Sequence, residues 1–408
     1  MRSPRPGVLF LIHDLRLGGA ERVFLSYVQN VEAVEAIPVL VRRRVEILDG
    51  VDPRAVLDLE TAHPGRARDD PGLPGPMGDG GRRRFASGWW APAPLALLLK
   101  ALRLRRLVRR SGARTVSTFL HKSHAIALCT KLLLDRSLRV VVNVHELPSQ
   151  HLEHHFGPLG RILMRAFMRA CFPRADLIVV VAQGVKDDLV EGFGVPASRV
   201  EVVSNPLDLD GIRRRADAPV PESLGGDDRP LVVAVGRLVP LKGLDYLLRA
   251  WARLSRRVEA RLAVLGEGPE RGRLEELARS LELEDSVRFL GALDNPWVHI
   301  SRARVLVLSS LTEGFPNVIG EAMALGTPVV ATHCSPGVEE YLEGGRCGLL
   351  VPPADPPALA AALERLLLDP ELGRRLARRG MERVQAFDLP RVVRTYEGLL
   401  LGTERADD

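Results

Sequence analysis

Two glutamates separated by seven residues, Glu313 and Glu321, lie in the part of the sequence with the clearest chemical potential. We expect Glu313 in the loop after a buried strand at 304–308, and Glu321 one turn inside the apolar helix that follows. The first N–H groups of a helix lack partners within it and carry the positive end of its dipole, so an anion binds there. A carboxylate one turn further on can accept hydrogen bonds from neighbouring sugar hydroxyls. The stretch therefore predicts a site for a phosphate attached to a sugar.

Two cations follow another expected strand. Arg237 and Lys242 lie five residues apart, before a helix that ends near Leu254. Such a pair at the carboxyl end of a strand suits a diphosphate, which arginine binds with forked hydrogen bonds and lysine with a point charge. The alternative is that both are ordinary surface charges on a loop. We favour the diphosphate.

Repeated strand–loop–helix units predict an α/β fold with doubly wound parallel sheets, in which ligands bind at the carboxyl ends of the strands. The first strand, at 8–12, is followed by Gly18 and Gly19, and the strand at 261–265 is followed by Gly266. Glycine lets the backbone approach a ligand closely, although a plain tight turn would also favour it.

The run Glu-Gly-Phe-Pro-Asn-Val-Ile-Gly-Glu-Ala-Met-Ala-Leu-Gly-Thr-Pro-Val-Val, at 313–330, resembles the signature of family 4 retaining glycosyltransferases. Those enzymes have the GT-B architecture, with two Rossmann-like domains facing across a cleft, and they use a nucleotide-sugar donor. The resemblance covers most of the chain and is most specific from about 232 to 351. Gly-Gly-Ala-Glu-Arg, at 18–22, resembles the family's first loop, where a glycine lies beside the donor's phosphates.

The resemblance implies a role for each candidate residue. Arg237 and Lys242 would bind the donor's diphosphate, Glu313 the sugar hydroxyls and Glu321 the ribose. The implied catalytic residues are Arg237, Lys242, Glu313 and His145. The implied donor-binding residues are Gly18, Gly19, Gly266, Leu290, Phe315, Asn317, Val318 and Glu321, with Leu290 beside the nucleobase and the three at the helix start acting through backbone N–H groups.

Several histidines follow two expected strands in the first half of the chain. His121 and His145 follow one strand each, so both should face the same crevice as the first glycine loop. The family places a histidine of this domain near the reacting carbon of the donor sugar; His145 fits that place best and His121 is second. The spacing of His151, His154 and His155 could suggest a metal. Because no carboxylate or cysteine is placed to complete a shell, we expect a mobile acceptor-side loop and no metal.

The predicted organisation is two domains joined by a short linker. It comprises an N-terminal acceptor-binding Rossmann-like domain at 1–215 with an irregular loop at about 61–94, a linker at 216–229, a C-terminal nucleotide-sugar-binding domain at 230–387, and a terminal helix at 388–408 that crosses back to the first domain.

Composition limits where the protein acts. The chain has 408 residues, 46% of them hydrophobic, a net charge of +6 and four widely spaced cysteines, which suggests a cytoplasmic protein with reduced thiols. No apolar run is long enough to span a bilayer. Basic amphipathic helices expected at 94–110 and 159–170 suit the anionic inner face of the cytoplasmic membrane, or alternatively pack on the sheet with a solvated arginine face. Nucleic acid is disfavoured because no binding motif accompanies the charge.

The sequence therefore predicts a retaining glycosyltransferase. It would move a sugar from a nucleoside-diphosphate sugar, with UDP favoured, to an acceptor hydroxyl on a lipid-linked or cell-envelope glycan. No cofactor is expected, because protein groups meet the phosphate charge. The alternatives are a sugar-nucleotide epimerase of the same architecture, a transferase acting on a small soluble acceptor, and an inactive scaffold, which the intact charged residues disfavour. A dehydrogenase is disfavoured because the loop at 13–20 lacks Gly-x-Gly-x-x-Gly.

Overall fold

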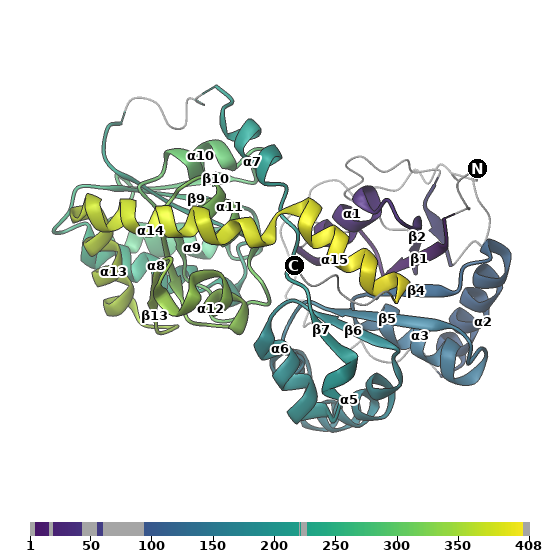
Figure 1. Cartoon of the computed structure of the whole chain (residues 1–408). Helices are drawn as coiled ribbons and strands as arrows, with labels where there is room; N and C mark the ends of the chain where they lie inside the picture. The colour runs from purple at the N-terminus through teal and green to yellow at the C-terminus, as the bar shows by residue number, and fades with distance from the viewer. Residues whose placement is uncertain are drawn as a thin grey trace, which may run out of the picture.

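The computed structural model describes residues 5–15, 19–42, 55–59, 94–219, 221 and 227–402. Two lobes lie side by side, each built on its own parallel β-sheet with helices packed against it (Figure 1). The predicted α/β fold with two doubly wound sheets is confirmed.

The first lobe, the N-lobe, contains a seven-stranded sheet. Its strands are β1 (Gly7–Ile12), β2 (Glu35–Leu40), β3 (Leu57–Asp58), β4 (Thr115–Phe119), β5 (Arg139–Val144), β6 (Leu177–Val180) and β7 (Val200–Val202), in the spatial order β3-β2-β1-β4-β5-β6-β7. Its helices include α1 (Gly19–Asn30), α2 (Pro94–Ser111), α3 (His121–Leu133), α4 (Pro148–His155), α5 (Pro158–Cys171) and α6 (Gln183–Asp187). The central strand β1 is at most 2% exposed from Val8 to Ile12, as expected for a parallel strand covered on both faces.

The second lobe, the C-lobe, contains a six-stranded sheet. Its strands are β8 (Leu231–Val235), β9 (Arg261–Leu265), β10 (Val287–Gly291), β11 (Val305–Leu308), β12 (Val329–Thr332) and β13 (Leu349–Val351), in the order β10-β9-β8-β11-β12-β13. Its helices include α8 (Leu244–Leu254), α9 (Arg271–Ser280), α10 (Trp297–Arg302), α11 (Asn317–Ala324), α12 (Pro336–Leu342), α13 (Pro356–Leu368) and α14 (Pro370–Arg383).

The strand order reverses at one point in each sheet, between β1 and β4 in the N-lobe and between β8 and β11 in the C-lobe. At such a switch point the connections leave in opposite directions, and the carboxyl ends of the two strands form a crevice for ligands. Gly19 and His121 follow β1 and β4, while Arg237 and Glu313 follow β8 and β11. The topology thus carries predicted site residues to the switch points of both sheets.

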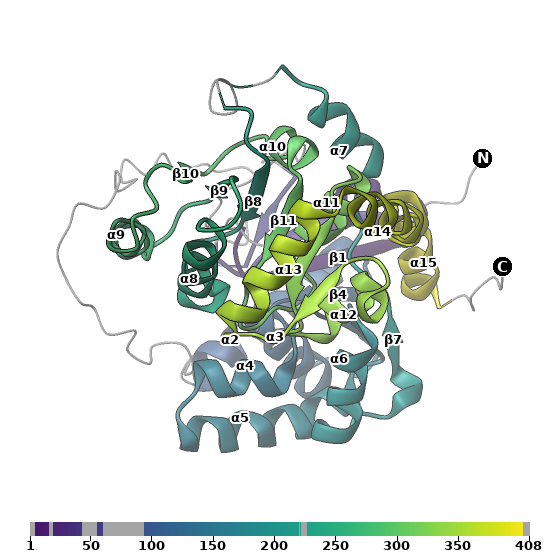
Figure 2. The same cartoon turned by 90° about the vertical axis from the view of Figure 1, so that its left-hand side faces the viewer.

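The end of the chain connects the lobes. Helix α14 lies on the C-lobe, and α15 (Leu389–Leu401) then runs across the N-lobe (Figures 1 and 2). Tyr396 of α15 stacks on Tyr27 of α1 with ring centroids 4.0 Å apart, and Glu397 Oε1 accepts a hydrogen bond from the backbone N–H of Ala33 at 2.5 Å.

Helix α7 (Leu209–Ala216) packs against α10 and α11 of the C-lobe. The Arg215 guanidinium donates to the carbonyl of Asp294 at 3.0 Å. The domain boundary predicted at residue 215 therefore falls inside a helix that contacts the second lobe. Asp208 begins this helix: its side chain accepts a hydrogen bond from the Gly211 N–H at 2.9 Å, as aspartate commonly does at this position.

The prediction of a mobile loop around His151, His154 and His155 is wrong. These residues belong to helix α4, which Pro148 begins at a position where its missing N–H costs nothing. Residues 61–93 of the predicted irregular loop, and Gly18, lie outside the described residues.

Candidate active site

An ion pair lies at the switch point of the C-lobe sheet. Lys242 ends the short 3-10 helix η5 (Pro240–Lys242), and its Nζ donates to Glu313 Oε1 at 2.5 Å. The same oxygen accepts a hydrogen bond from Ser310 Oγ at 2.6 Å. The Glu313 side chain is only 12% exposed, so the pair is largely removed from water. Two oppositely charged groups predicted for one site are thus in direct contact.

Glycine is required beside this pair. Gly243 has φ 59°, and a Cβ there would lie 2.2 Å from the carbonyl oxygen of Ser309. The absence of a side chain lets the turn after β8 pack against the turn after β11. A small pocket opens beside them, lined among others by Arg237, Lys242 and Ser310. The exposed Arg237 and the partly buried Lys242 therefore line the same pocket.

The start of α11 lies between the lobes. The Phe315 side chain is buried against Tyr341, with ring centroids 4.2 Å apart, so it belongs to the core. Asn205 of the N-lobe donates through Nδ2 to Asn317 Oδ1 at 2.9 Å and to the carbonyl of Phe315 at 3.4 Å. The side chain of Phe315 thus packs in the core, and that of Asn317 forms a hydrogen bond between the lobes. Their backbone N–H groups, with that of Val318, precede the helix's own hydrogen bonds and stay candidate anion donors.

Glu321 occupies the fifth position of α11 and is partly buried. Burial raises the pKa of its carboxyl above the usual value, while the charge of Arg22 and the indole N–H of Trp297 lower it. Arg22 belongs to α1 of the N-lobe, so Glu321 interacts electrostatically across the interface between the lobes. Neither Arg22 nor Trp297 was predicted as a site residue, although Arg22 ends the Gly-Gly-Ala-Glu-Arg run.

The remaining predicted donor residues differ in how much room surrounds them. Gly266 has φ 143°, and a Cβ there would lie 1.9 Å from the carbonyl oxygen of Gly236, so its close approach is to the chain itself. Leu290, near the end of β10, is partly buried and packs against the core. Gly19 opens α1, and a Cβ there would meet nothing within 4 Å.

His145 directly follows β5. Its ring stacks on Phe119, with centroids 5.6 Å apart. Burial lowers the pKa of His145 to about 4, although a hydrogen bond to Asn205 and the charge of Glu146 both raise it. A Cβ on Gly314 would lie 1.9 Å from the carbonyl oxygen of His145. The turn that follows Glu313 therefore touches the backbone of His145, which brings these two predicted catalytic residues to the same interface.

The tautomer of His145 follows from its partner. Asn205 uses its amide nitrogen to donate to two oxygens of the C-lobe, which leaves Oδ1 to face His145 Nδ1 at 3.3 Å. An oxygen accepts, so Nδ1 carries the proton and Nε2 has a free lone pair. In the described part of the chain, this Nε2 atom is buried without a hydrogen-bond partner.

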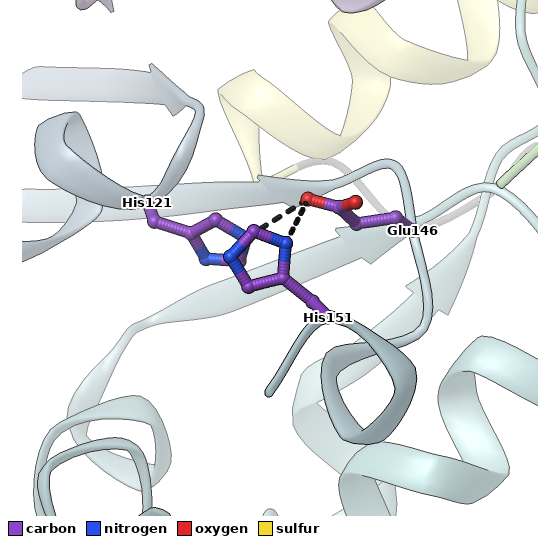
Figure 3. A group of neighbouring side chains, drawn as sticks. All are labelled: His121, Glu146 and His151. Carbon is purple, nitrogen blue, oxygen red and sulfur yellow. Dashed lines mark hydrogen bonds and ion pairs between the residues drawn. The ribbon is translucent and has the colours of Figure 1, made fainter. Parts of the chain in front are cut away.

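A second group of polar side chains was not predicted from the sequence. His121 Nε2 lies 3.0 Å and His151 Nδ1 2.9 Å from the same oxygen, Oε1 of Glu146 (Figure 3). Partial burial opposes the ionisation of Glu146, but hydrogen bonds from the two histidines outweigh it and hold the pKa of its carboxyl well below the usual range. The carboxylate that the sequence did not place beside His151 is thus supplied by Glu146.

Two family models match consecutive parts of the chain. "Glycosyltransferase Family 4" matches residues 53–210, and "Glycosyl transferases group 1" matches residues 220–383. The first covers much of the N-lobe and the second most of the C-lobe.

Curated relatives match over most of their length. The N-acetylgalactosamine-N,N'-diacetylbacillosaminyl-diphospho-undecaprenol 4-alpha-N-acetylgalactosaminyltransferase of Campylobacter jejuni is 30% identical over 309 residues, covering 76% of this chain and 82% of that protein. The alpha-D-kanosaminyltransferase of Streptomyces kanamyceticus is 34% identical over 304 residues, covering 71% and 76%. Among solved structures, Anabaena HepE in complex with UDP has a similar fold, with a TM-score of 0.74 at 19% identity over 97% of this chain and 99% of that one.

Proposed function

The chain belongs to the group 1 glycosyl transferases and is a glycosyltransferase, and from this premise we propose that it transfers a sugar from a UDP-sugar to a hydroxyl of a lipid-linked or envelope glycan. The observation that carries the proposal is the contact of Lys242 with Glu313 at the C-lobe switch point, beside Arg237 and the start of α11. The name of the Campylobacter jejuni relative includes a diphospho-undecaprenol glycan, which supports a lipid-linked acceptor. The similar fold of Anabaena HepE was solved in complex with UDP, which supports a UDP-sugar donor.

The proposed mechanism follows the charge that develops as the donor breaks. Cleavage of the bond between sugar and phosphate leaves negative charge on the diphosphate. Lys242, Arg237 and the first N–H groups of α11 would stabilise this charge as it grows, which lowers the barrier. Lysine has three N–H donors, so Lys242 can hold Glu313 and a phosphate oxygen together. Since protein cations meet the leaving group, we propose that transfer itself needs no metal.

Glu313 and His145 would position the donor sugar from opposite sides of the interface. Glu313, held by Lys242 and Ser310, keeps lone pairs that can accept sugar hydroxyls. Neutral His145 offers the lone pair of Nε2 to another hydroxyl. We propose that Glu321 accepts the ribose hydroxyls. We also propose retention of configuration, with the departing phosphate accepting the acceptor's proton on the face it leaves.

The nucleotide site is tested by calorimetry with UDP. Lys242→Ala and Glu321→Ala should each weaken binding at least ~10-fold, or about 1.4 kcal/mol. Glu276→Ala is the matched control, because Glu276 is exposed on α9. Unchanged affinity in both site variants rejects the site. A screen of nucleotide-sugars then identifies the donor: a transferase requires an acceptor for turnover, whereas an epimerase does not.

An exposed apolar stripe on α5 supports a lipid-linked acceptor. Leu159, Ile162 and Leu163 are 70%, 66% and 63% exposed, and they recur at helical spacing so that they share one face. Basic side chains on the same helix, Arg161 and Arg165, suit anionic headgroups. We propose that this face contacts the membrane that holds the acceptor. Within the described residues, no helix combines the length and apolarity needed to cross a bilayer.

Flotation with anionic liposomes at low salt tests this contact. The protein should float, and Leu159→Gln combined with Ile162→Gln should reduce the floating fraction. Leu368→Gln, which changes an equally exposed leucine on α13 of the C-lobe, should not. Failure of the unmodified protein to float would remove the membrane proposal without affecting the UDP site.

A further inference from the structure

The group formed by His121, Glu146 and His151 has the composition of a metal site. Its three ligand atoms all lie within 4.8 Å of one another (Figure 3). Both imidazole nitrogens approach Glu146 Oε1 at 2.9–3.0 Å. In a tetrahedral zinc site with bonds of about 2.0–2.1 Å, neighbouring ligand atoms are about 3.3 Å apart. Both nitrogen–oxygen distances are a few tenths of an ångström below this value, so small shifts of the side chains would bring these two pairs to it.

We infer that these three residues bind one divalent transition-metal ion, and that zinc fits their chemistry best. Two imidazoles and one carboxylate are a ligand set that zinc accepts, whereas magnesium and calcium prefer shells of oxygen alone. Three protein ligands leave a fourth position for water or a ligand oxygen. Glu146 keeps 44% of its side chain exposed, so the group is open to solvent on that side.

The ligands come from elements that hold them firmly. His121 begins α3 at the end of β4, Glu146 follows β5, and His151 lies on α4, where it is 93% removed from solvent. Strands β4 and β5 pair in parallel, which aligns their carboxyl ends. Leu120, directly before His121, has φ 67°, a value that non-glycine residues adopt only where the surroundings impose it. The local backbone is thus constrained at the point where His121 is presented.

The proposed ion would stabilise the N-lobe side of the interface. Glu146 directly follows His145, and Gln150, the neighbour of His151 on α4, accepts a hydrogen bond from Thr312 of the C-lobe at 2.6 Å. An ion that joins Glu146 to His151 would fix the short connection between β5 and α4. None of the three ligands belongs to the Lys242–Glu313 pair, so UDP affinity reports on that pair separately.

Metal binding by the whole chain tests the inference. The protein is first treated with a chelator, which is then removed. Titration with Zn²⁺ in a calorimeter should show that it binds one equivalent. Loaded with Co²⁺ instead, it should show the intense visible absorption of a four-coordinate ion. His121→Ala and His151→Ala should each weaken Zn²⁺ affinity by about 100-fold or more, since even outer-shell partners are worth about 10- to 100-fold.

His154→Ala is the matched control, because His154 is exposed on the same helix and lies outside the group. It should bind Zn²⁺ like the unmodified chain. If His151→Ala does not fold, His121→Ala and the Co²⁺ spectrum of the unmodified chain still decide the question. Absence of saturable Zn²⁺ binding overturns the inference, as does equal affinity in the histidine variants and the control. UDP affinity, measured in parallel, reports separately on the proposed function.

Discussion

The two sides of the interface between the lobes differ in how their chemistry is assembled. On the C-lobe side, permanent charges predominate: Lys242 and Glu313 form an ion pair beside Arg237. On the N-lobe side, a neutral His145 lies near a carboxylate shared by two further histidines. The cations of the C-lobe are thus suited to stabilise negative charge that develops on a leaving group, whereas the N-lobe side offers a neutral imidazole that suits a hydroxyl group. One interface can thus combine two kinds of electrostatic environment, because each lobe supplies one.

Lys242→Ala is the change that should affect the C-lobe side most. Loss of a preorganised cation at a developing anion should lower kcat/KM by about 100- to 1,000-fold. Initial rates of UDP release in the presence of acceptor measure it. Arg249→Ala, which removes an exposed cation on α8 of the same lobe, should have little effect. A loss below tenfold would show that the C-lobe does not act through its fixed charges.

The same contrast explains what the sequence could and could not predict. Arg237 and Lys242 follow one strand of the C-lobe sheet, and Glu313 follows the adjacent strand. The spacing of these charged residues after their strands indicates a shared site, so their proximity could be predicted from the sequence. The group around Glu146 was not predicted, because His151 was expected in a loop and no carboxylate was expected beside it. The helix α4, which turns His151 toward Glu146, is short and lacks a strong periodic pattern.

Close packing also escapes prediction from sequence. That Gly314 is needed for contact with His145, or Gly266 for contact with Gly236, depends on distances that only the folded chain defines. Gly266 was predicted to approach a ligand; the structure shows that it also approaches the backbone of Gly236, and its contact with a ligand stays a prediction. The parallel sheets themselves were predictable, because their strands read as continuous apolar runs.

Gly314→Ala should separate the two sides without removing a functional group. The new Cβ would lie 1.9 Å from the His145 carbonyl oxygen, so the Glu313 turn and the β5 end must move apart. Misplacement of about 1 Å can cost about 100-fold in rate, and we expect a loss of that order in kcat. UDP affinity should change little, because Lys242 and Arg237 stay in place. Gly272→Ala is the control, since a Cβ there meets nothing within 4 Å. An equal loss of UDP affinity would show damage to the C-lobe itself.

Because His145 of the N-lobe is neutral in the folded chain, the free energy of unfolding should depend on pH. The folded pKa of His145, about 4, lies below the usual unfolded value of about 6.5, so the unfolded chain binds the proton more readily. Neutral His145 therefore makes its full contribution to the free energy of unfolding above pH 6.5, and this contribution is lost as the pH falls toward 4. Between pH 7.5 and pH 5 the loss amounts to about 2 kcal/mol. Urea unfolding of the unmodified chain and of His145→Asn at both pH values measures it. The drop should be about 2 kcal/mol smaller in the variant, and identical drops would contradict a neutral His145.

Thr312→Val should have the smallest effect, because it removes one hydrogen bond between the two sides. Thr312 Oγ1 donates to Gln150 Oε1 at 2.6 Å, and valine keeps the shape of threonine without the donor. A neutral hydrogen bond contributes about 1 kcal/mol, so kcat/KM should fall by about fivefold. Gln150→Ala and the double variant complete a cycle. If the bond holds the lobes together during turnover, the double variant should lose no more than either single one. Additive losses would mean that the residues act independently, and that contact between the lobes rests on the Gly314 turn and Asn205.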